Sequence, residues 1–216
     1  QVVPSGISLE QHNRRLSDDE RREKRRGLGI PDNHQVLLSL GRLGTEKNLG
    51  ELLEFFSTAL TQNSQLTFLI VGDGPDREHL EQLAKDLGVE SHVIFTGMVE
   101  PWQVQEYYQL ADIFVSASTS ETQGLTYIEA AANGLPLLCR KDDCLCGVIK
   151  EGVNGYEYTS QDEFLEKLNI ILENPEWRKN AGKQSQKIAK SFDKSQFVEM
   201  MEAIYESVKD EEPLDI

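Results

Sequence analysis

The sequence predicts an α/β protein with a doubly wound, Rossmann-like parallel sheet, helices on both faces and a helical C-terminal tail. Short apolar runs alternate with longer amphipathic stretches along the chain. Most of the runs are apolar almost throughout, which is typical of parallel strands buried on both faces. Glycine-rich loops follow several of the runs, and this end of the strands is where open α/β sheets bind ligands.

Each element is predicted from its own pattern. Five runs have the length and composition of buried strands, namely residues 35–40, 66–71, 92–95, 113–116 and 135–139. Leucine spacing predicts amphipathic helices over 49–60 and 80–87. Ser17 and Glu20 have the spacing of a capping box, which predicts a short charged helix that Gly27 ends.

The C-terminal part changes character, because residues 161–208 have the periodicity of two or three helices. Trp102, Tyr107 and Tyr108 are expected to pack from a helix rather than to form an aromatic platform. The chain begins at Gln1 with a stretch that resembles the middle of a protein. We therefore expect it to be a piece of a longer chain.

Composition excludes several classes of function. The 216 residues include 22 Lys and Arg against 37 Asp and Glu, and the formal charge of −15 argues against a nucleic-acid partner. Three cysteines form no closed disulfide set, no signal peptide is recognisable, and no apolar run approaches the ~20 residues of a spanning helix. These features predict one large domain in the cytoplasm.

The basic segment 14–26 allows two interpretations. It could contact anionic lipid, or it could be a solvated helix whose acidic neighbours balance its charge. The cysteines Cys139, Cys144 and Cys146 lack the paired spacing of a metal site, so we interpret them as packing residues and incidental thiols and predict no metal.

Two glycine-rich loops are candidate ligand sites. In the loop 41–47, Arg42 and Lys47 could converge on one anion while Gly41 lets it approach the backbone, or the loop could be an ordinary solvated turn. The loop 72–75 superficially resembles a dinucleotide fingerprint. Arg77 replaces the third glycine and the loop follows the second strand, so we exclude a nicotinamide cofactor and keep only a tight turn facing a ligand.

A third candidate site is the segment 119–129, which opens an alanine-rich helix. The start of a helix offers N–H groups and a partial positive charge that suit a phosphate, and Gly124 removes a side chain at that point. Glu121 and Glu129 are eight positions apart, so both could face one cleft. The alternative is one capping carboxylate and one surface carboxylate.

These motifs occur in an order that resembles a known family. Gly41-Arg42 with Glu46-Lys47, then residues 72–75, then Glu121 to Glu129 followed by Ala-Asn-Gly-Leu-Pro, resemble the C-terminal donor-binding half of retaining GT-B glycosyltransferases, the group 1 or family 4 enzymes. The resemblance implies a nucleotide-sugar-binding domain over 1–216, with an interdomain linker remnant at 1–8 and C-terminal helices at 161–209. The family's N-terminal acceptor domain, which carries a catalytic histidine motif, has no counterpart here. Within the family, the Glu121–Glu129 segment and residues 140–145 resemble diacylglycerol glucosyltransferases of Gram-positive bacteria.

The resemblance also implies a role for each motif residue. Arg42 and Lys47 would stabilise the departing diphosphate together with the backbone of Leu125 and Thr126, and no metal would be needed. Glu121 would bind the donor sugar and Glu129 the ribose. The other donor-contacting positions implied are Gly41, Gly74, Met98, Val99, Gln123 and Gly124. Gln123 stands where the family usually has an apolar residue beside the sugar.

The implied parent enzyme is a hexosyltransferase that uses UDP-glucose without a cofactor. It would transfer the sugar to an acceptor such as diacylglycerol, through contact with its own N-terminal domain and peripherally with the cytosolic membrane face. This domain alone would bind the donor but transfer almost nothing. The alternatives are a polysaccharide or protein acceptor, a UDP-sugar epimerase of similar fold, and a non-catalytic interaction module.

Overall fold

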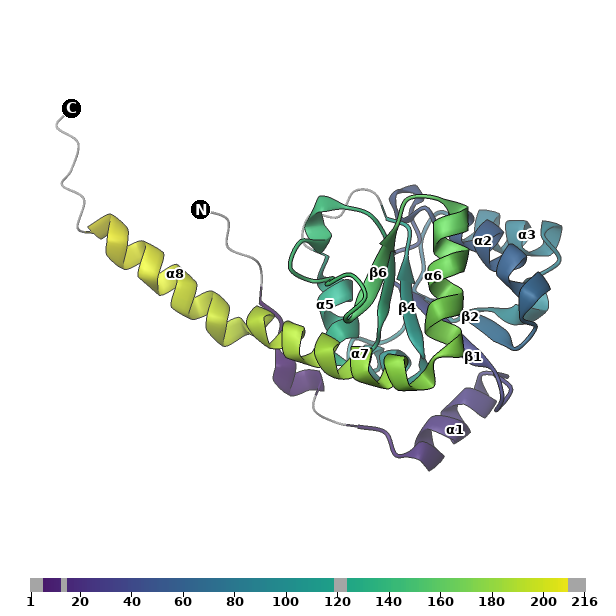
Figure 1. Cartoon of the computed structure of the whole chain (residues 1–216), viewed down its shortest axis with the longest axis horizontal. Coiled ribbons are helices and arrows are strands. Elements are labelled where there is room, and N and C mark those ends of the chain that lie inside the picture. The colour runs from purple at the N-terminus through teal and green to yellow at the C-terminus, as the bar shows by residue number, and fades with distance from the viewer. Residues whose placement is uncertain (1–5, 13–14, 119–123, 210–216) are drawn as a thin grey trace.

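The computed structural model describes residues 6–12, 15–118 and 124–209, and it has the predicted α/β architecture (Figure 1). The strands form one parallel sheet in the order β3-β2-β1-β4-β5-β6. Their bounds are β1 Gln35–Leu40, β2 Leu66–Val71, β3 Val93–Phe95, β4 Ile113–Ser116, β5 Leu137–Arg140 and β6 Gly155–Tyr158.

The helices surround this sheet. Those that the structure describes are α1 Asp18–Gly27, α2 Leu49–Gln62, α3 Arg77–Asp86, α4 Val104–Leu110, α5 Leu125–Ala132, α6 Gln161–Glu173, α7 Pro175–Ala189 and α8 Lys194–Lys209. Short 3-10 helices are η1 Leu9–His12, η2 Thr45–Lys47, η3 Glu90–His92, η4 Asp143–Leu145 and η5 Lys190–Phe192. None of these helices is both long enough and apolar enough to cross a bilayer.

Two hydrophobic cores lie on opposite faces of the sheet. Helices α2, α3 and α6 pack on one face and α4 and α5 on the other, where α7 lies against α5. Successive strand residues alternate between the cores, so Leu37 belongs to the first and Leu38 to the second. Burying one leucine side chain stabilises the folded state by roughly 1.5–3 kcal/mol. The buried side chains on both faces therefore hold the strands of the sheet in register.

The order of the strands creates a crevice between β1 and β4. From β1 the chain builds outward through β2 and β3, and from β4 it builds in the opposite direction through β5 and β6. β1 and β4 are paired in parallel, with Leu37 opposite Ile113 and Leu38 opposite Phe114. The loops that follow these two strands diverge toward opposite faces, which opens the ligand crevice of doubly wound sheets.

The sheet differs from the sequence prediction in β6 and at the start of two strands. β3 begins at Val93 rather than 92, because His92 still belongs to η3. β6 was not predicted, because only Gly155 and Tyr158 of its four residues are buried and the apolar run is too weak. Glu151 covers its outer edge by accepting a hydrogen bond from the Glu157 N–H at 2.9 Å. β5 begins at Leu137 rather than 135, since Pro136 has no N–H to donate to the ladder.

α1 has both the predicted start and the predicted end. Ser17 and Glu20 form the capping box. Gly27 is the last residue of the helix, as predicted, and the residue that takes the left-handed conformation beyond it is Gly29, with φ +79°. The N–H of Ile30 then bonds the carbonyl of Arg25, as in a Schellman motif.

The basic side chains of α1 and the residues before it bind protein oxygens. Arg25 is 6% exposed and donates to the Leu110 carbonyl and to Asp112. Arg21 also pairs with Asp112, at 2.8 Å, and Arg15 donates to the Asn133 carbonyl. Burial alone would raise the pKa of Asp112, but the charges of the two arginines outweigh it and hold the pKa below its ordinary value. These cations therefore anchor α1 to the domain, which favours a structural role over lipid contact.

The aromatic residues near α4 are only partly as predicted. Tyr108 is fully buried and Tyr107 packs partly against the same core. Trp102 was expected to pack from the helix, and this prediction is wrong, because α4 begins only at Val104. The turn that follows Pro101 leaves Trp102 72% exposed.

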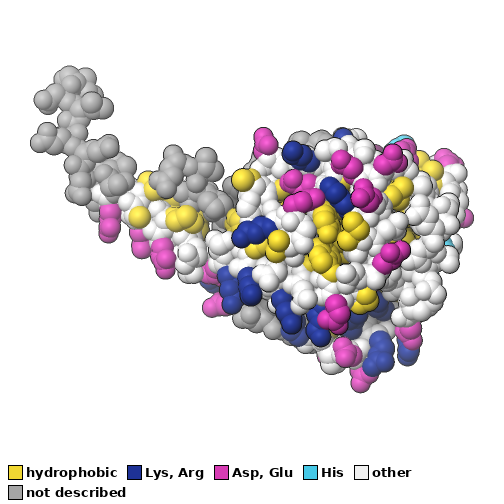
Figure 2. All heavy atoms as spheres, in the orientation of Figure 1, with side chains coloured by type: hydrophobic (Ala, Val, Ile, Leu, Met, Phe, Trp, Pro, Cys, Tyr) yellow, Lys and Arg dark blue, Asp and Glu magenta, His cyan; other side chains and the backbone are white. Residues whose placement is uncertain are grey.

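The C-terminal part contains three α-helices, as predicted, and α8 extends away from the body of the domain (Figure 1). Hydrophobic side chains lie along α8 (Figure 2), and Val198 and Tyr205 are 48% and 65% exposed. The base of α8 binds the start of the described chain, since Ile7 N–H donates to the Phe192 carbonyl and Lys194 N–H to the Ile7 carbonyl.

Candidate functional site

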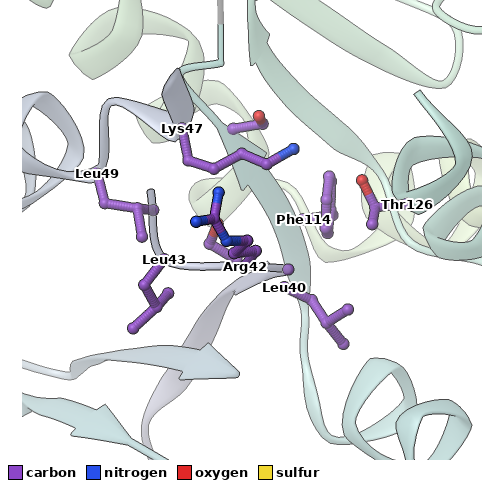
Figure 3. Close-up of a pocket in the computed structure, with 10 residues that line it drawn as sticks. Leu40, Arg42, Leu43, Lys47, Leu49, Phe114 and Thr126 are labelled. Carbon is purple, nitrogen blue, oxygen red and sulfur yellow. The ribbon is translucent and has the colours of Figure 1, made fainter. Parts of the chain in front are cut away.

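Basic side chains and the start of a helix meet at the crevice between β1 and β4 (Figure 3). Arg42 follows β1 directly and Lys47 ends η2, which is the next turn of the chain. Both line one pocket with Gly41 and with Thr126 from the first turn of α5, and we call it the cation pocket. Lys47 extends across it toward Thr126 in Figure 3. The structure thus brings together residues that are separated by about eighty positions in the sequence.

The start of α5 is shaped by a glycine. Gly124 precedes the helix in the left-handed conformation, with φ +57°. A Cβ atom there would lie 2.5 Å from the Tyr127 ring, so a larger residue would displace the first turn. By the geometry of an α-helix, the N–H groups of Leu125 and Thr126 have no acceptor within the helix. They form the positive end of the helix dipole beside Lys47 and Arg42.

The two glycines of the loop 72–75 are explained by backbone packing. A Cβ atom on Gly72 would lie 1.9 Å from the Gly41 carbonyl oxygen, and one on Gly74 would lie 2.3 Å from the Leu43 carbonyl oxygen. The Leu43 N–H also donates to the Asp73 carbonyl at 2.9 Å. The loops after β1 and β2 therefore form one compact unit, and the glycines are needed for their contact.

A groove adjoins the cation pocket and shares Leu40, Gly41 and Arg42 with it. Its other wall contains Gly74, Met98 and Val99, three of the positions expected to contact the donor. Met98 is 85% exposed, whereas Val99 is half-buried. These donor-contacting positions and the two cations thus line one continuous surface along the carboxyl edge of the sheet.

Glu129 lies one turn beyond Thr126 on α5 and is half-buried. The hydroxyl of Tyr108 donates to its Oε2 at 2.8 Å. Burial raises the pKa of Glu129, and the hydrogen bond from Tyr108 opposes that rise. Glu121 and Gln123 belong to residues 119–123, which lie outside the described part of the chain.

Sequence reasoning missed a charged cluster beside the cation pocket. Arg140, at the end of β5, binds both carboxylate oxygens of Glu51 at 2.7 and 2.6 Å. Tyr158 and Asn48 donate to the same carboxylate at 3.3 and 3.1 Å. Glu51 therefore ties the turn after Lys47 to the ends of β5 and β6. Its partner Arg140 is 89 residues away, so no local spacing could have indicated it.

The cysteines differ in their surroundings. Cys139 is buried in the core on β5, and burial raises the pKa of its thiol well above the ordinary value. Cys144 is half-buried and Cys146 is exposed. Among the described residues, His, Cys, Asp and Glu form no group of three or more that could hold a metal ion.

A comparison with known protein families shows to which family the chain belongs. Residues 20–188 match the family described as glycosyl transferases group 1. The match covers most of the chain, so the protein belongs to this family of transferases. The family resemblance inferred from the motifs is confirmed.

Two curated relatives are alpha-monoglucosyldiacylglycerol synthases. The one from Acholeplasma laidlawii is 32% identical over 205 residues, which cover 94% of this chain and 52% of the relative. The one from Streptococcus pneumoniae is 38% identical over 163 residues, which cover 75% and 37%. The chain is therefore similar to diacylglycerol glucosyltransferases and spans about half of their length or less.

Solved structures show the same fold. HepE of Anabaena in complex with UDP superposes with a TM-score of 0.86 at 22% identity, covering 96% of this chain and 57% of that chain. The C-terminal domain of the Francisella tularensis group 1 protein LpcC superposes with a TM-score of 0.73 at 21% identity, covering 86% and 97%. The fold is that of the C-terminal domain of a GT-B glycosyltransferase.

Proposed function

We propose that this chain is the donor-binding domain of a retaining hexosyltransferase and that its donor is UDP-glucose. The observation that carries the proposal is the cation pocket, where Arg42 and Lys47 face the positive end of α5. Two cationic side chains and the N-terminal end of a helix all attract an anion that lies between them. A diphosphate has the charge and the oxygens to satisfy all of these donors at once.

The same arrangement would promote the reaction. When the bond between the sugar and the diphosphate breaks, negative charge accumulates on the departing UDP. Arg42, Lys47 and the amides of Leu125 and Thr126 would stabilise that charge more strongly than they stabilise the intact donor, which lowers the barrier. We assign Glu121 to the donor sugar, where it would place the anomeric carbon, and Glu129 to the ribose hydroxyls.

The comparisons support the choice of donor. HepE is described in complex with UDP-glucose, and the pneumococcal O-GlcNAc transferase GtfA, which is 26% identical to this chain, in complex with UDP and GlcNAc. The groove beside the cation pocket would receive the uracil, with Met98 and Val99 against the base. Glucose is favoured because the two curated relatives described above are named alpha-monoglucosyldiacylglycerol synthases.

We propose diacylglycerol as the acceptor and an N-terminal domain of the same enzyme as the part that binds it. That domain would pack along α8 and the segment 6–12, because the hydrogen bonds of Ile7 hold that segment to the base of α8. Apolar residues exposed on α8, such as Val198 and Tyr205, would be covered there. The parent enzyme would then act in the cytoplasm, with a peripheral contact to the membrane that supplies its acceptor.

Calorimetric titration of this chain with UDP, UDP-glucose and ADP-glucose tests donor binding. We expect UDP and UDP-glucose to bind. ADP-glucose has the same diphosphate, so it should also bind, but more weakly because its base is not the uracil that the groove would receive. An absence of nucleotide binding would instead favour a non-catalytic interaction module. A transfer assay on the same chain should show no product, and sustained glycosylation of an acceptor would overturn the division of labour between domains.

Product analysis of the parent enzyme tests the acceptor. With UDP-glucose and diacylglycerol in vesicles, we expect a glucosyl lipid with the α configuration of the donor. Free epimerised sugar would identify a UDP-sugar epimerase. Glycosylation of a polysaccharide or protein in place of the lipid would keep the donor assignment and refute the acceptor assignment.

A further inference from the structure

A buried tyrosine beneath the donor site has its hydroxyl directed at a site carboxylate. Tyr108 on α4 is 0% exposed and packs against Phe114, with ring centroids 6.1 Å apart. Its hydroxyl lies 2.8 Å from Glu129 Oε2 and 3.3 Å from the Thr126 carbonyl oxygen. The hydroxyl has one hydrogen to donate, and a carboxylate is the stronger and here the nearer acceptor.

This contact fixes one oxygen of Glu129 and leaves the other for a ligand. Oε2 binds Tyr108, so Oε1 is the oxygen that can accept from outside. Thr126 lies three residues earlier on the same helix and lines the cation pocket. Val104 lies four residues before Tyr108 on α4 and lines the adjoining groove. The Tyr108–Glu129 pair therefore lies one helical turn beyond Thr126, which lines the pocket, and Val104, which lines the groove.

We propose that Tyr108 is a positioning residue for the nucleotide: its hydroxyl holds the Glu129 carboxylate in the orientation that meets the ribose hydroxyls. The inference rests on the proposed donor site and adds a residue to it. Tyr108 touches no part of the donor and acts only through Glu129. Burial of Glu129 favours its neutral form, and the hydrogen bond from Tyr108 favours the ionised form that accepts two hydroxyls.

The test compares UDP with 2′,3′-dideoxy-UDP, which keeps the base and the diphosphate but lacks both ribose hydroxyls. Tyr108→Phe should weaken UDP about five- to tenfold and leave dideoxy-UDP almost unchanged. Glu129→Gln should remove the same preference, and the double variant should show little further loss. Equal weakening of both nucleotides by Tyr108→Phe, or no weakening of either, would overturn the proposal.

Tyr127→Phe is a matched control. Tyr127 is also buried, packs edge-on against Phe114 at 5.7 Å, and has its hydroxyl 2.9 Å from Ser116 Oγ. It should lose a comparable amount of thermal stability while keeping the preference for UDP over dideoxy-UDP. If Tyr127→Phe removed the preference as Tyr108→Phe does, the effect would be one of packing and the proposal would fail.

The pH dependence of UDP binding adds a readout that a structural role would not move. Affinity should fall as Glu129 becomes protonated on the acid side, and removing the Tyr108 hydroxyl should move that midpoint to higher pH. An unchanged midpoint would contradict the proposal. If Tyr108→Phe does not fold, 13Cζ-tyrosine NMR of the unmodified chain replaces it. The Tyr108 resonance should then move more with UDP than with dideoxy-UDP, and equal movement would refute the inference.

A wild-type chain that binds neither nucleotide would refute the proposed function, and the inference would fall with it. A wild-type chain that binds UDP and dideoxy-UDP equally would leave the diphosphate site intact and refute only the ribose role of Glu129 and Tyr108. The two failures are thus distinguishable in one set of titrations.

Discussion

Basic side chains meet helix ends at both edges of the sheet, but with opposite electrostatic consequences. At one edge, Arg15 donates to the carbonyls of Ala132 and Asn133 at the C-terminal end of α5, and Arg25 donates to the carbonyl of Leu110 at the end of α4. At the other edge, Lys47 and Arg42 face the N-terminal end of α5. The helix dipole attracts the first group of cations and repels the second.

Burial follows the same division. The Arg25 side chain is 8% exposed and pairs with Asp112 at 2.8 Å, whereas the Arg42 side chain is 67% exposed and meets Glu46 only at 3.5 Å. At the first edge the protein itself supplies the negative partners, so these cations stabilise the fold. At the second edge, where we propose that the donor diphosphate binds, the positive end of α5 would attract the same anion as the two cations. The direction of the nearest helix, rather than the type of basic residue, thus distinguishes the structural cations from those that we propose to bind the donor.

Removal of Arg25 should have the largest effect on the fold. Arg25→Ala would leave Asp112 buried with less compensation, and we expect a loss of about 3 kcal/mol in the free energy of unfolding, measured by urea denaturation. UDP affinity of the folded protein should stay within twofold. Arg22→Ala is the control, because Arg22 pairs with an exposed Asp19 and should change little. A loss of UDP binding in Arg25→Ala without a loss of stability would break the comparison.

The pH dependence of that difference has a predicted sign. The folded-state pKa of Asp112 is below its ordinary value, so its contribution is fully present above the unfolded pKa of about 3.9 and is lost as pH falls through the folded pKa. The stability gap between wild type and Arg25→Ala should therefore narrow below about pH 4. A gap that stays constant from pH 7 to pH 3 would show that Asp112 is not the partner that matters.

The variant Glu121→Gln tests the proposed chemistry at the carboxyl edge of the sheet and leaves Arg42 and Lys47 in place. Because the proposed partner of Glu121 is the sugar and not the diphosphate, Glu121→Gln should leave UDP affinity within about twofold. Transfer by the parent enzyme should fall about 10²–10³-fold, as for other groups that act mainly in the transition state. If Glu121→Gln weakened UDP as strongly as removal of Lys47 does, the assignment of separate roles would be wrong.

Arg140 sharpens the comparison, because it lies at the carboxyl edge of the sheet but is paired with Glu51 of the protein itself. Its bond to Glu51 is partly exposed, with 29% and 18% of the two side chains accessible. Arg140→Gln should cost about 1 kcal/mol of stability in thermal or urea unfolding and change UDP affinity less than threefold. A tenfold loss of UDP affinity with unchanged stability would place Arg140 among the binding cations.

The sequence predicted much of this fold because its strands are buried on both faces. Runs such as Leu66–Val71 are continuous apolar segments that local pattern can identify. β6 was missed because it is short and half-exposed. The end of α1 at Gly27 was predicted correctly, although the left-handed residue beyond it is Gly29. The prediction that Trp102 packs from a helix was wrong, because its exposure depends on where α4 begins.

The residues of the site also divide into those that the sequence could indicate and those that it could not. Arg42, Lys47 and Thr126 could be proposed from sequence because each follows a strand and because the motifs resemble a family. The contacts of Glu51 with Arg140 and of Tyr108 with Glu129 join elements 89 and 21 residues apart, and they depend on how helices pack on the sheet. Such side-chain pairings have no period in the sequence, so only the three-dimensional arrangement discloses them.

The role of the cation pocket is tested most directly by titrating UDP into the wild-type chain, Lys47→Ala and Lys179→Ala under identical conditions. Lys179 is an exposed lysine on α7 and controls for the loss of one positive charge. We expect Lys47→Ala to weaken UDP about ten- to a hundredfold at an unchanged melting temperature, and Lys179→Ala to bind like the wild type. Equal affinities in all three proteins would show that the pocket does not hold the diphosphate.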